Sequence, residues 1–367
     1  MLKSLYVKNF TVFAEANFEF GSGLNVVVGT NGTGKSHVLK LGYAVLFNSA
    51  ARLKELRNMA AHSKQTAVSG SFDFVKLEEK LKGVFGPVPN DLSELVRRGA
   101  EPAEATIRFS LSDEPLIAGN LNFGTGESDG SSFENLTTPI LMRVSDSLAA
   151  PVLIPAKEIL TLGWIVPAYD QLVLSLDESY LDLLKQLSGL SLRKPEPAAA
   201  AALQQLTTIL GGGVQEDNGR FYLVFPKEKR LEMNMVAEGL RKFGTLQKLL
   251  ANGRLTLKST LFWDEPEANL NPALLKKLAA VLAELARQGF QIILATHSSF
   301  LLKQLHILNH EKTSIPLPIH YFGLNAQPGE STVVTTTNDF AELPDIVALD
   351  EELAQAGEFL DVLNDDE

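Results

Sequence analysis

One stretch of the sequence has the residue types and the spacing of a phosphate-binding loop. Residues 29–36 read Gly-Thr-Asn-Gly-Thr-Gly-Lys-Ser and fit the pattern G-x-x-x-x-G-K-[ST] without a gap. Glycines let successive backbone N–H groups curl around phosphate oxygens, and a helix start adds its positive end. In such a loop Lys35 reaches the β- and γ-phosphates, and the Ser36 hydroxyl binds Mg²⁺. The pattern therefore predicts a site for ATP and Mg²⁺, with these nucleotide contacts: Gly29, Thr30, Asn31, Gly32, Thr33, Gly34, Lys35, Ser36 and His37.

Two adjacent carboxylates end an apolar run further along the chain. Residues 261–265 read Leu-Phe-Trp-Asp-Glu, which predicts a buried strand followed by two acidic side chains. Phosphoryl transfer needs one carboxylate near the magnesium and a second to polarise the attacking water, because one group cannot do both in line. We therefore predict that Asp264 joins Ser36 at the metal and that Glu265 is catalytic. Without a phosphate loop in the same chain, this run would be read as an ordinary strand end.

A histidine follows the next apolar strand. His297 comes shortly after the run at residues 291–295. A histidine in this position often only provides a polar end to a strand, but beside the two motifs above it stands where a sensor of the γ-phosphate belongs. We predict a catalytic set of Lys35, Glu265 and His297.

The segments around these motifs are predicted to alternate between strands and helices. Residues 2–29 read as three strands, and a long helix follows at about residues 34–64. From residue 235 the order is helix, strand, helix, strand. Asn271 and Gly289 mark the start and the end of the second of these helices. This alternation indicates βαβ units and a parallel sheet.

The 229 positions between Lys35 and Asp264 exceed what a minimal nucleotide-binding domain needs. We expect the middle of the chain to hold the remaining strands of the lobe and a compact, largely helical insertion or lid. The patterns predict strands near residues 105–112, 116–123, 140–144 and 221–225, and helices near 76–81 and across 157–210. The expected divisions are residues 1–64 and 235–340 for the two parts of the nucleotide-binding head, 65–234 for the middle region, and 341–367 for an acidic tail.

Together these motifs resemble those of the ABC-type P-loop ATPases of the SMC, RecF and OLD group. Asp264-Glu265-Pro266 resembles the Walker B motif, Ala268-Asn269-Leu270 the D-loop, and His297 the switch histidine. The resemblance covers about residues 1–40 and 235–300. It implies an α/β ATPase head with a mixed central sheet flanked by helices, and hydrolysis of ATP. The sequence is most similar to compact bacterial relatives of OLD proteins, many of which serve in anti-phage defence.

In this group a second copy of the chain completes the ATP site with a signature loop at a helix start. The best match is Val236-Ala237-Glu238-Gly239, ahead of a helix predicted at residues 240–250. The resemblance implies that Glu238, Gly239 and the D-loop Asn269 contact the nucleotide in a head-to-tail dimer or a larger homo-oligomer. An ordinary helix start is the alternative. The usual serine is replaced by Ala237, so one hydroxyl contact is missing and we expect slow hydrolysis.

The glutamine of the Q-loop, another element of this group, is not placed by the sequence. Lys157, Glu158 and Gln171 lie in the expected part of the chain. Basic residues also gather near the signature loop, among them Arg241 and Lys242. They are read either as contacts to nucleic-acid phosphates or as a solvated face.

Composition limits the class of protein. The chain of 367 residues has no cysteine, which excludes disulfides and cysteine nucleophiles and fits a reducing cytoplasm. No signal peptide and no apolar run of a membrane span's length is found, so no membrane contact is predicted. Residues 313–367 hold 12 of the 44 acidic residues and none of the 33 lysines and arginines. This tail is expected either to keep the end of the chain solvated or to bind a basic partner.

Three functions remain open from the sequence. The first is a sensor ATPase that controls a separate effector protein, which the lack of a dense metal-ligand cluster after His297 favours over a built-in nuclease. The second is a DNA-maintenance ATPase that binds DNA. The third is an ATP-dependent scaffold with negligible turnover.

Overall fold

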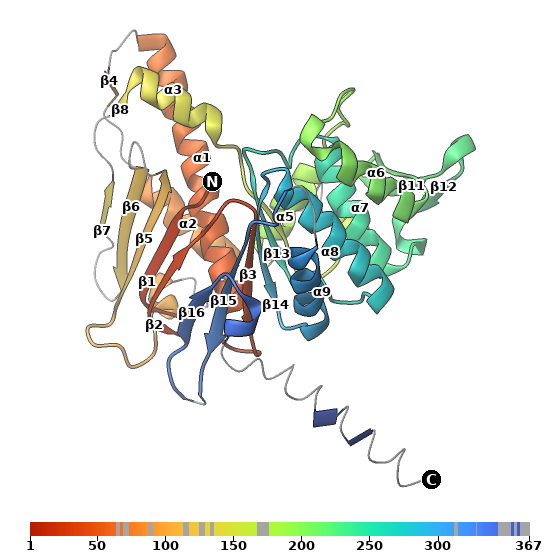
Figure 1. The fold of residues 1–367 in the computed structure, drawn as a ribbon. Coiled ribbons are helices and arrows are strands. Elements are labelled where there is room, and N and C mark those ends of the chain that lie inside the picture. Colours follow the sequence, from red (N-terminus) through yellow and green to blue (C-terminus); the bar gives the residue numbers. More distant parts are fainter. Residues whose placement is uncertain are drawn as a thin grey trace.

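The computed structural model contains a central sheet with helices on both faces (Figure 1). It describes residues 1–63, 67–68, 73–86, 91–112, 117–124, 129–132, 136–166, 176–311, 315–327, 329–343, 354–355 and 358–359. Most of the acidic tail, Gln171 and several short segments of the middle region lie outside these ranges. No helix of the described residues is long and apolar enough to cross a bilayer.

Six strands form the central sheet. In chain order they are β3 (Leu24–Gly29), β9 (Val152–Ile154), β13 (Thr260–Asp264), β14 (Gln291–Thr296), β15 (Ile319–Asn325) and β16 (Val333–Thr337). Their order across the sheet is β16-β15-β3-β14-β13-β9, and all pairs are parallel except β15 with β16. β14 is buried along its whole length, as expected for a central parallel strand that helices cover on both faces. The sheet is therefore mixed, as predicted.

A long helix and an antiparallel sheet cover one face of the central sheet. The helix α1 (Lys35–Ser63) leaves the end of β3 directly and lies between the two sheets (Figure 1). The second sheet has the order β2-β1-β5-β6-β7. Its strands are β1 (Ser4–Phe10), β2 (Phe13–Glu19), β5 (Glu104–Ser112), β6 (Ile117–Gly124) and β7 (Asp129–Ser132). Beside it lie α2 (Phe74–Phe85), the pair β4 (Ala67–Val68) and β8 (Leu136–Thr137), and α3 (Thr138–Ser147).

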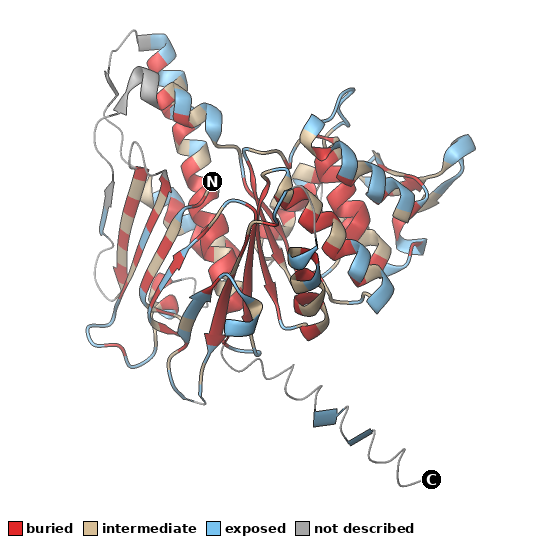
Figure 2. Ribbon diagram, viewed as in Figure 1, coloured by how far each residue is buried: buried red, intermediate tan, exposed pale blue. Residues whose placement is uncertain are grey.

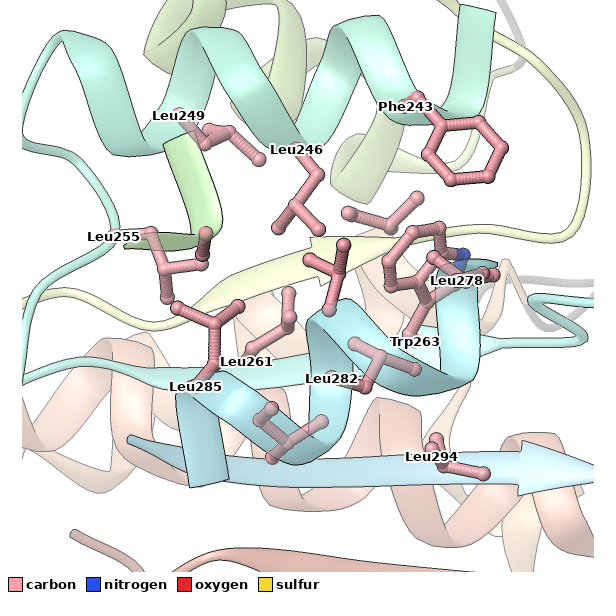
Figure 3. Close-up of a cluster of buried hydrophobic side chains, with 14 of the residues drawn as sticks. Phe243, Leu246, Leu249, Leu255, Leu261, Trp263, Leu278, Leu282, Leu285 and Leu294 are labelled. Atoms are coloured by element: carbon pink, nitrogen blue, oxygen red, sulfur yellow. The ribbon is translucent and has the colours of Figure 1, made fainter. Parts of the chain in front are cut away.

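Helices cover the other face. They are α5 (Glu178–Leu187), α6 (Ala200–Leu210), α7 (Glu238–Ala251), α8 (Pro272–Arg287) and α9 (Ser299–His310). Figure 3 shows leucines of α7 and α8 meeting Trp263 and Leu294 of the sheet in one buried cluster. A three-stranded sheet, β10 (Gly213–Asp217), β11 (Arg220–Val224) and β12 (Arg230–Glu232), extends from this side. Figure 2 shows its outer part exposed, whereas the central strands are buried.

Most elements agree with the predictions from the sequence, but one predicted strand is a helix. The strand predicted at residues 140–144 is wrong, because these residues lie in α3. Leu141 and Val144 are buried three positions apart and face α1, which is helical spacing. A short apolar run does not distinguish the two periods. The helix predicted across 157–210 is confirmed only for α5 and α6.

Candidate functional site

The predicted motifs meet at the carboxyl ends of three neighbouring strands. The phosphate loop follows β3, His297 follows β14, and Asp264 and Glu265 end β13. These strands are adjacent in the order β3-β14-β13. In open α/β sheets, ligands bind in the crevice outside the carboxyl ends of the strands. The topology therefore brings together residues that lie up to 268 positions apart in the sequence.

The phosphate loop has a closed, cradle-like backbone. Gly32 and Gly34 have φ of 84° and 94°, which residues with a side chain rarely adopt. A Cβ at Gly34 would also lie 2.6 Å from Val12. The Lys35 ammonium is buried inside the loop and donates to the carbonyl oxygens of Gly29 and Thr30 at 2.8 and 2.9 Å. Burial lowers its pKa, against the opposing charges of nearby carboxylates.

Ser36 and Asp264 lie in direct contact. The Ser36 hydroxyl donates to Oδ2 of Asp264 at 2.7 Å. Oδ1 of Asp264 is buried, and no group of the described residues hydrogen-bonds to it. Burial raises the pKa of Asp264, partly offset by the Ser36 hydrogen bond. A hydroxyl and a carboxylate with an unused buried oxygen fit Mg²⁺, which takes oxygen ligands and usually keeps several waters.

The second carboxylate faces the histidine. Nδ1 of His297 lies 3.2 Å from Oε1 of Glu265 and 3.6 Å from Oε1 of Glu267. The backbone of Glu265 is left-handed, with φ of 44°, and its N–H donates to the carbonyl oxygen of Ala295 at 2.9 Å. A non-glycine residue in this conformation is uncommon, and such residues cluster at functional sites. Glu265 and His297 are both partly exposed to solvent, so an incoming group can reach them.

Glu267 also belongs to this site, although no role was predicted for it from the sequence. Its side chain is 9% exposed. Its Oε1 accepts hydrogen bonds from the Thr296 hydroxyl at 2.6 Å and from the His297 backbone N–H at 3.1 Å. The signal was the third acidic residue in Asp264-Glu265-Pro266-Glu267, but only the three-dimensional pairing shows that it meets the strand carrying His297.

The predicted signature and D-loop residues form a second group. Asn269 donates to Oε1 of Glu238 at 2.8 Å, and a Cβ at Gly239 would lie 2.8 Å from the carbonyl oxygen of Asn269. Glu238 and Asn269 are exposed. None of the hydrogen bonds of the described residues joins this group to residues 29–36. α7 begins at Glu238, and its N-cap Ala237 makes no side-chain hydrogen bond to the helix.

The remaining sequence candidates take other positions. Nδ1 of His37 lies 3.0 Å from the Thr11 hydroxyl, so its side chain has a protein partner. Glu158 is buried and pairs with Arg241 at 3.2 Å. Arg241 is therefore not part of a free basic face. Lys157 follows β9 and lies near Ser36 and Asp264 around a common cavity.

Two family models and one curated relative match parts of this chain. A family model described as "AAA domain, putative AbiEii toxin, Type IV TA system" matches residues 105–303, and one described as "AAA domain" matches residues 4–113. The DNA replication and repair protein RecF of Pediococcus pentosaceus is 37% identical over 71 residues, which are 19% of this chain and 19% of RecF. The chain thus spans about a fifth of the length of this curated relative.

Solved SMC heads share the fold. An SMC head bound to the C-winged helix domain of ScpA is 14% identical, covers 93% of this chain and 98% of its own, and has a TM-score of 0.52. An SMC head with an extended coiled coil, bound to the C-terminal domain of ScpA derived from Pyrococcus furiosus, is 11% identical, covers 99% of both chains and has a TM-score of 0.50. The predicted fold class, a mixed sheet flanked by helices, is confirmed.

Proposed function

The chain belongs to the AAA-domain family whose model matches residues 105–303, among the ABC-type P-loop ATPases of the SMC and RecF group, and on this premise we propose that it binds ATP with Mg²⁺ and hydrolyses it to ADP and phosphate. One observation carries the proposal. The Ser36 hydroxyl lies 2.7 Å from Asp264, and the next residue, Glu265, lies 3.2 Å from His297. The two residues proposed to bind the metal, Ser36 and Asp264, thus lie next to the proposed general base, Glu265. His297, the proposed sensor of the γ-phosphate, lies beside that base.

Each of these residues has a part in the proposed reaction. Lys35 exchanges its contacts with the loop carbonyls for oxygens of the β- and γ-phosphates. Ser36 and Asp264 hold Mg²⁺, which when bound neutralises the charge that develops on the phosphates. Glu265 polarises the attacking water, and His297 donates a hydrogen bond to the γ-phosphate. The backbone N–H groups of residues 29–37 surround the other phosphate oxygens.

We also propose that two copies assemble head to tail with ATP between them. The support is that no hydrogen bond of the described residues joins Glu238, Gly239 or Asn269 to the phosphate loop of their own chain, and that Glu238, at the start of α7, and Asn269 are exposed. The N–H groups of the first turn of α7 have no side-chain cap, and a helix N-terminus favours an anion. Hydrolysis removes the γ-phosphate contact and loosens the pair, so the nucleotide sets the state of assembly.

For the biological role we propose a cytoplasmic sensor ATPase that controls a separate effector protein in bacterial anti-phage defence. The family description, which names a type IV toxin–antitoxin system, supports this role. The alternative is a DNA-maintenance ATPase, which the local similarity to RecF favours. Hydrolysis stimulated by added DNA supports the alternative. Retention of the product of a neighbouring gene by purified Glu265→Gln protein, with no effect of DNA, supports the first.

The ATPase proposal is tested by measuring Mg²⁺-dependent ATP binding and phosphate release on the same preparations. Lys35→Ala is expected to weaken binding. Glu265→Gln is expected to keep binding and to lower turnover by about 10²- to 10⁴-fold, the usual contribution of a general base. Glu284→Gln on α8 is the matched control, because the Glu284 side chain accepts a hydrogen bond from Gln288, away from the proposed site. Wild-type protein without Mg²⁺-dependent affinity for ATP would overturn the proposal.

A further inference from the structure

A cavity of about 260 Å³ with both apolar and polar lining residues lies beside the proposed metal site. Its walls come from three parts of the chain: the start of α1 with Ser36, the end of β13 with Asp264, and the first turn of α5 with Ser179 and Tyr180. Lys157, which follows β9, also lines it. α5 belongs to the middle region, and the sequence predicted no contact of this helix with the nucleotide.

Two residues that line this cavity each have a buried side-chain oxygen with no hydrogen-bond partner among the described residues. One is Oδ1 of Asp264, and the other is the hydroxyl oxygen of Ser179, whose residue is 1% exposed. Leaving a buried polar atom unsatisfied costs about 1–3 kcal/mol, so nearly all such groups in native proteins have partners. Two of them around one cavity, on elements 85 positions apart in the sequence, indicate a polar occupant that both contact.

The cavity is held in shape by ion pairs between its walls. Lys40, one turn after Ser36 on α1, pairs with Asp177 at 2.7 Å. Asp177 in turn caps α5 by accepting a hydrogen bond from the Ser179 N–H at 2.8 Å. Lys80 of α2 pairs with Glu178 at 3.0 Å on the same helix start. The first turn of α5 is therefore fixed to the helix that carries the phosphate loop.

Tyr180 provides a third hydroxyl group. Burial, followed by the negative charges of Asp177 and Asp264, raises the pKa of Tyr180. Its phenol therefore stays protonated at neutral pH and can both donate and accept a hydrogen bond. The lining thus combines hydroxyl groups with two carboxylates and two ammonium groups, those of Asp177, Asp264, Lys40 and Lys157. Such a lining offers ordered water both donors and acceptors.

We propose that Ser179 and Tyr180 are further contacts of the magnesium site, where their hydroxyl groups hydrogen-bond the water molecules that Mg²⁺ retains when it binds with the nucleotide. The inference rests on the proposed function. Mg²⁺ keeps several waters because it dehydrates reluctantly, and each of these waters needs an acceptor for its protons. Oδ1 of Asp264 and the two hydroxyl oxygens are acceptors on residues that line the cavity, which Asp177 and Ser36 line as well. The helix α5 is on this account part of the nucleotide site.

The test is a titration of Mg²⁺ against the binding of a fluorescent ATP analogue, with Ser179→Ala and Tyr180→Phe. Each variant is expected to raise the Mg²⁺ concentration for half-maximal binding by about three- to tenfold, the effect of one lost hydrogen bond. Affinity for the analogue in excess chelator should not change. Ser188→Ala, at the other end of α5, and Tyr222→Phe, on β11, are the matched controls.

Thermal unfolding of each variant separates lost contacts from lost folding. Tyr180 is only partly buried, so Tyr180→Phe is expected to fold. It can therefore be measured even if Ser179→Ala lowers the Tm. The inference is overturned if Tyr180→Phe and a folded Ser179→Ala both reach half-maximal binding at a Mg²⁺ concentration within twofold of that of the wild type. That result would leave the ATPase proposal intact. Wild-type protein that binds the analogue without regard to Mg²⁺ would instead overturn both.

Discussion

The buried ammonium of Lys242 donates to the backbone carbonyl oxygen of Glu265 over 2.9 Å. It also lies 3.5 Å from the carbonyl oxygen of Pro266. Lys242 is on the second turn of α7, the helix whose first residues form the proposed signature loop. The sequence placed this lysine on a phosphate-binding or solvated face, and both readings are wrong because the residue is 3% exposed. This hydrogen bond joins the proposed signature helix to the backbone of Glu265, the proposed catalytic residue, within one chain.

Replacing Lys242 with methionine should lower turnover more than ATP affinity. The variant keeps the aliphatic stem but leaves two carbonyl groups without their charged donor, so Glu265 loses its fixed position. A misplacement of this kind costs roughly 10²-fold in rate, with about 1–3 kcal/mol of stability. The measurement is kcat and the Kd for ATP in parallel.

Lys248→Met is the control for this change. Lys248 lies on the same helix with the same exposure of 3%, and burial lowers the pKa of both lysines. No hydrogen bond of the described residues joins Lys248 to the strand end at Glu265. Equal losses of kcat in the two variants would show that only helix stability matters.

Glu265→Gln should accumulate an ATP-bound dimer. The amide keeps the size of the side chain but cannot act as a base, so the γ-phosphate contact persists. Light scattering coupled to size exclusion should show a doubled mass with saturating MgATP and a monomer without it. A second change, Gly239→Ala, should abolish the dimer, because its Cβ would lie 2.8 Å from the carbonyl oxygen of Asn269. A Glu265→Gln protein that stays monomeric with saturating MgATP would contradict the dimer proposal.

Asp264→Asn should stabilise the metal-free protein while removing its response to Mg²⁺. Burial raises the folded-state pKa of Asp264 above its ordinary value of 3.8. The folded state therefore prefers the protonated form, and the stability this contributes is lost as the pH rises from 3.8 through the raised pKa. The variant has no charge to bury. Its free energy of unfolding should therefore exceed that of the wild type by about 1 kcal/mol, and the difference should be largest at neutral pH.

The check is the difference in Tm between variant and wild type in chelator, measured from about pH 5 to pH 8. The difference should grow or stay level as the pH rises. Addition of Mg²⁺ with ATP should raise the Tm of the wild type only. A difference that shrinks with rising pH contradicts the assigned cause.

Glu267→Ala should lower turnover by roughly 10²-fold with little change in ATP affinity, through a displaced His297. The change removes the acceptor of the Thr296 hydroxyl and of the His297 N–H. Glu342→Ala is a matched control, since Glu342 accepts from the Thr337 hydroxyl at the same 2.6 Å near the end of β16. Full activity of Glu267→Ala would remove this residue from the site.

The sequence was sufficient for those parts of the site that depend on local order. The loop at residues 29–36 fixes its own backbone through glycines and a helix start, and an apolar run that ends in Asp264 fixes a strand end, so both could be predicted. The cavity beside α5 could not, because it depends on how a short helix that ends 77 positions before Asp264 in the chain packs on α1. Lys242 was misplaced for a similar reason, since a lysine at helical spacing is normally solvated.

The length of α1 sets how the nucleotide site communicates with the rest of the molecule. The helix has 29 residues, about 43 Å at 1.5 Å per residue, and its first residue is the lysine inside the phosphate loop. A rotation of about 5° at Lys35 therefore moves the far end near Ser63 by about 4 Å. As a rigid body, α1 would act as a lever arm that converts a small rotation at the proposed nucleotide site into a displacement of several ångström at its far end.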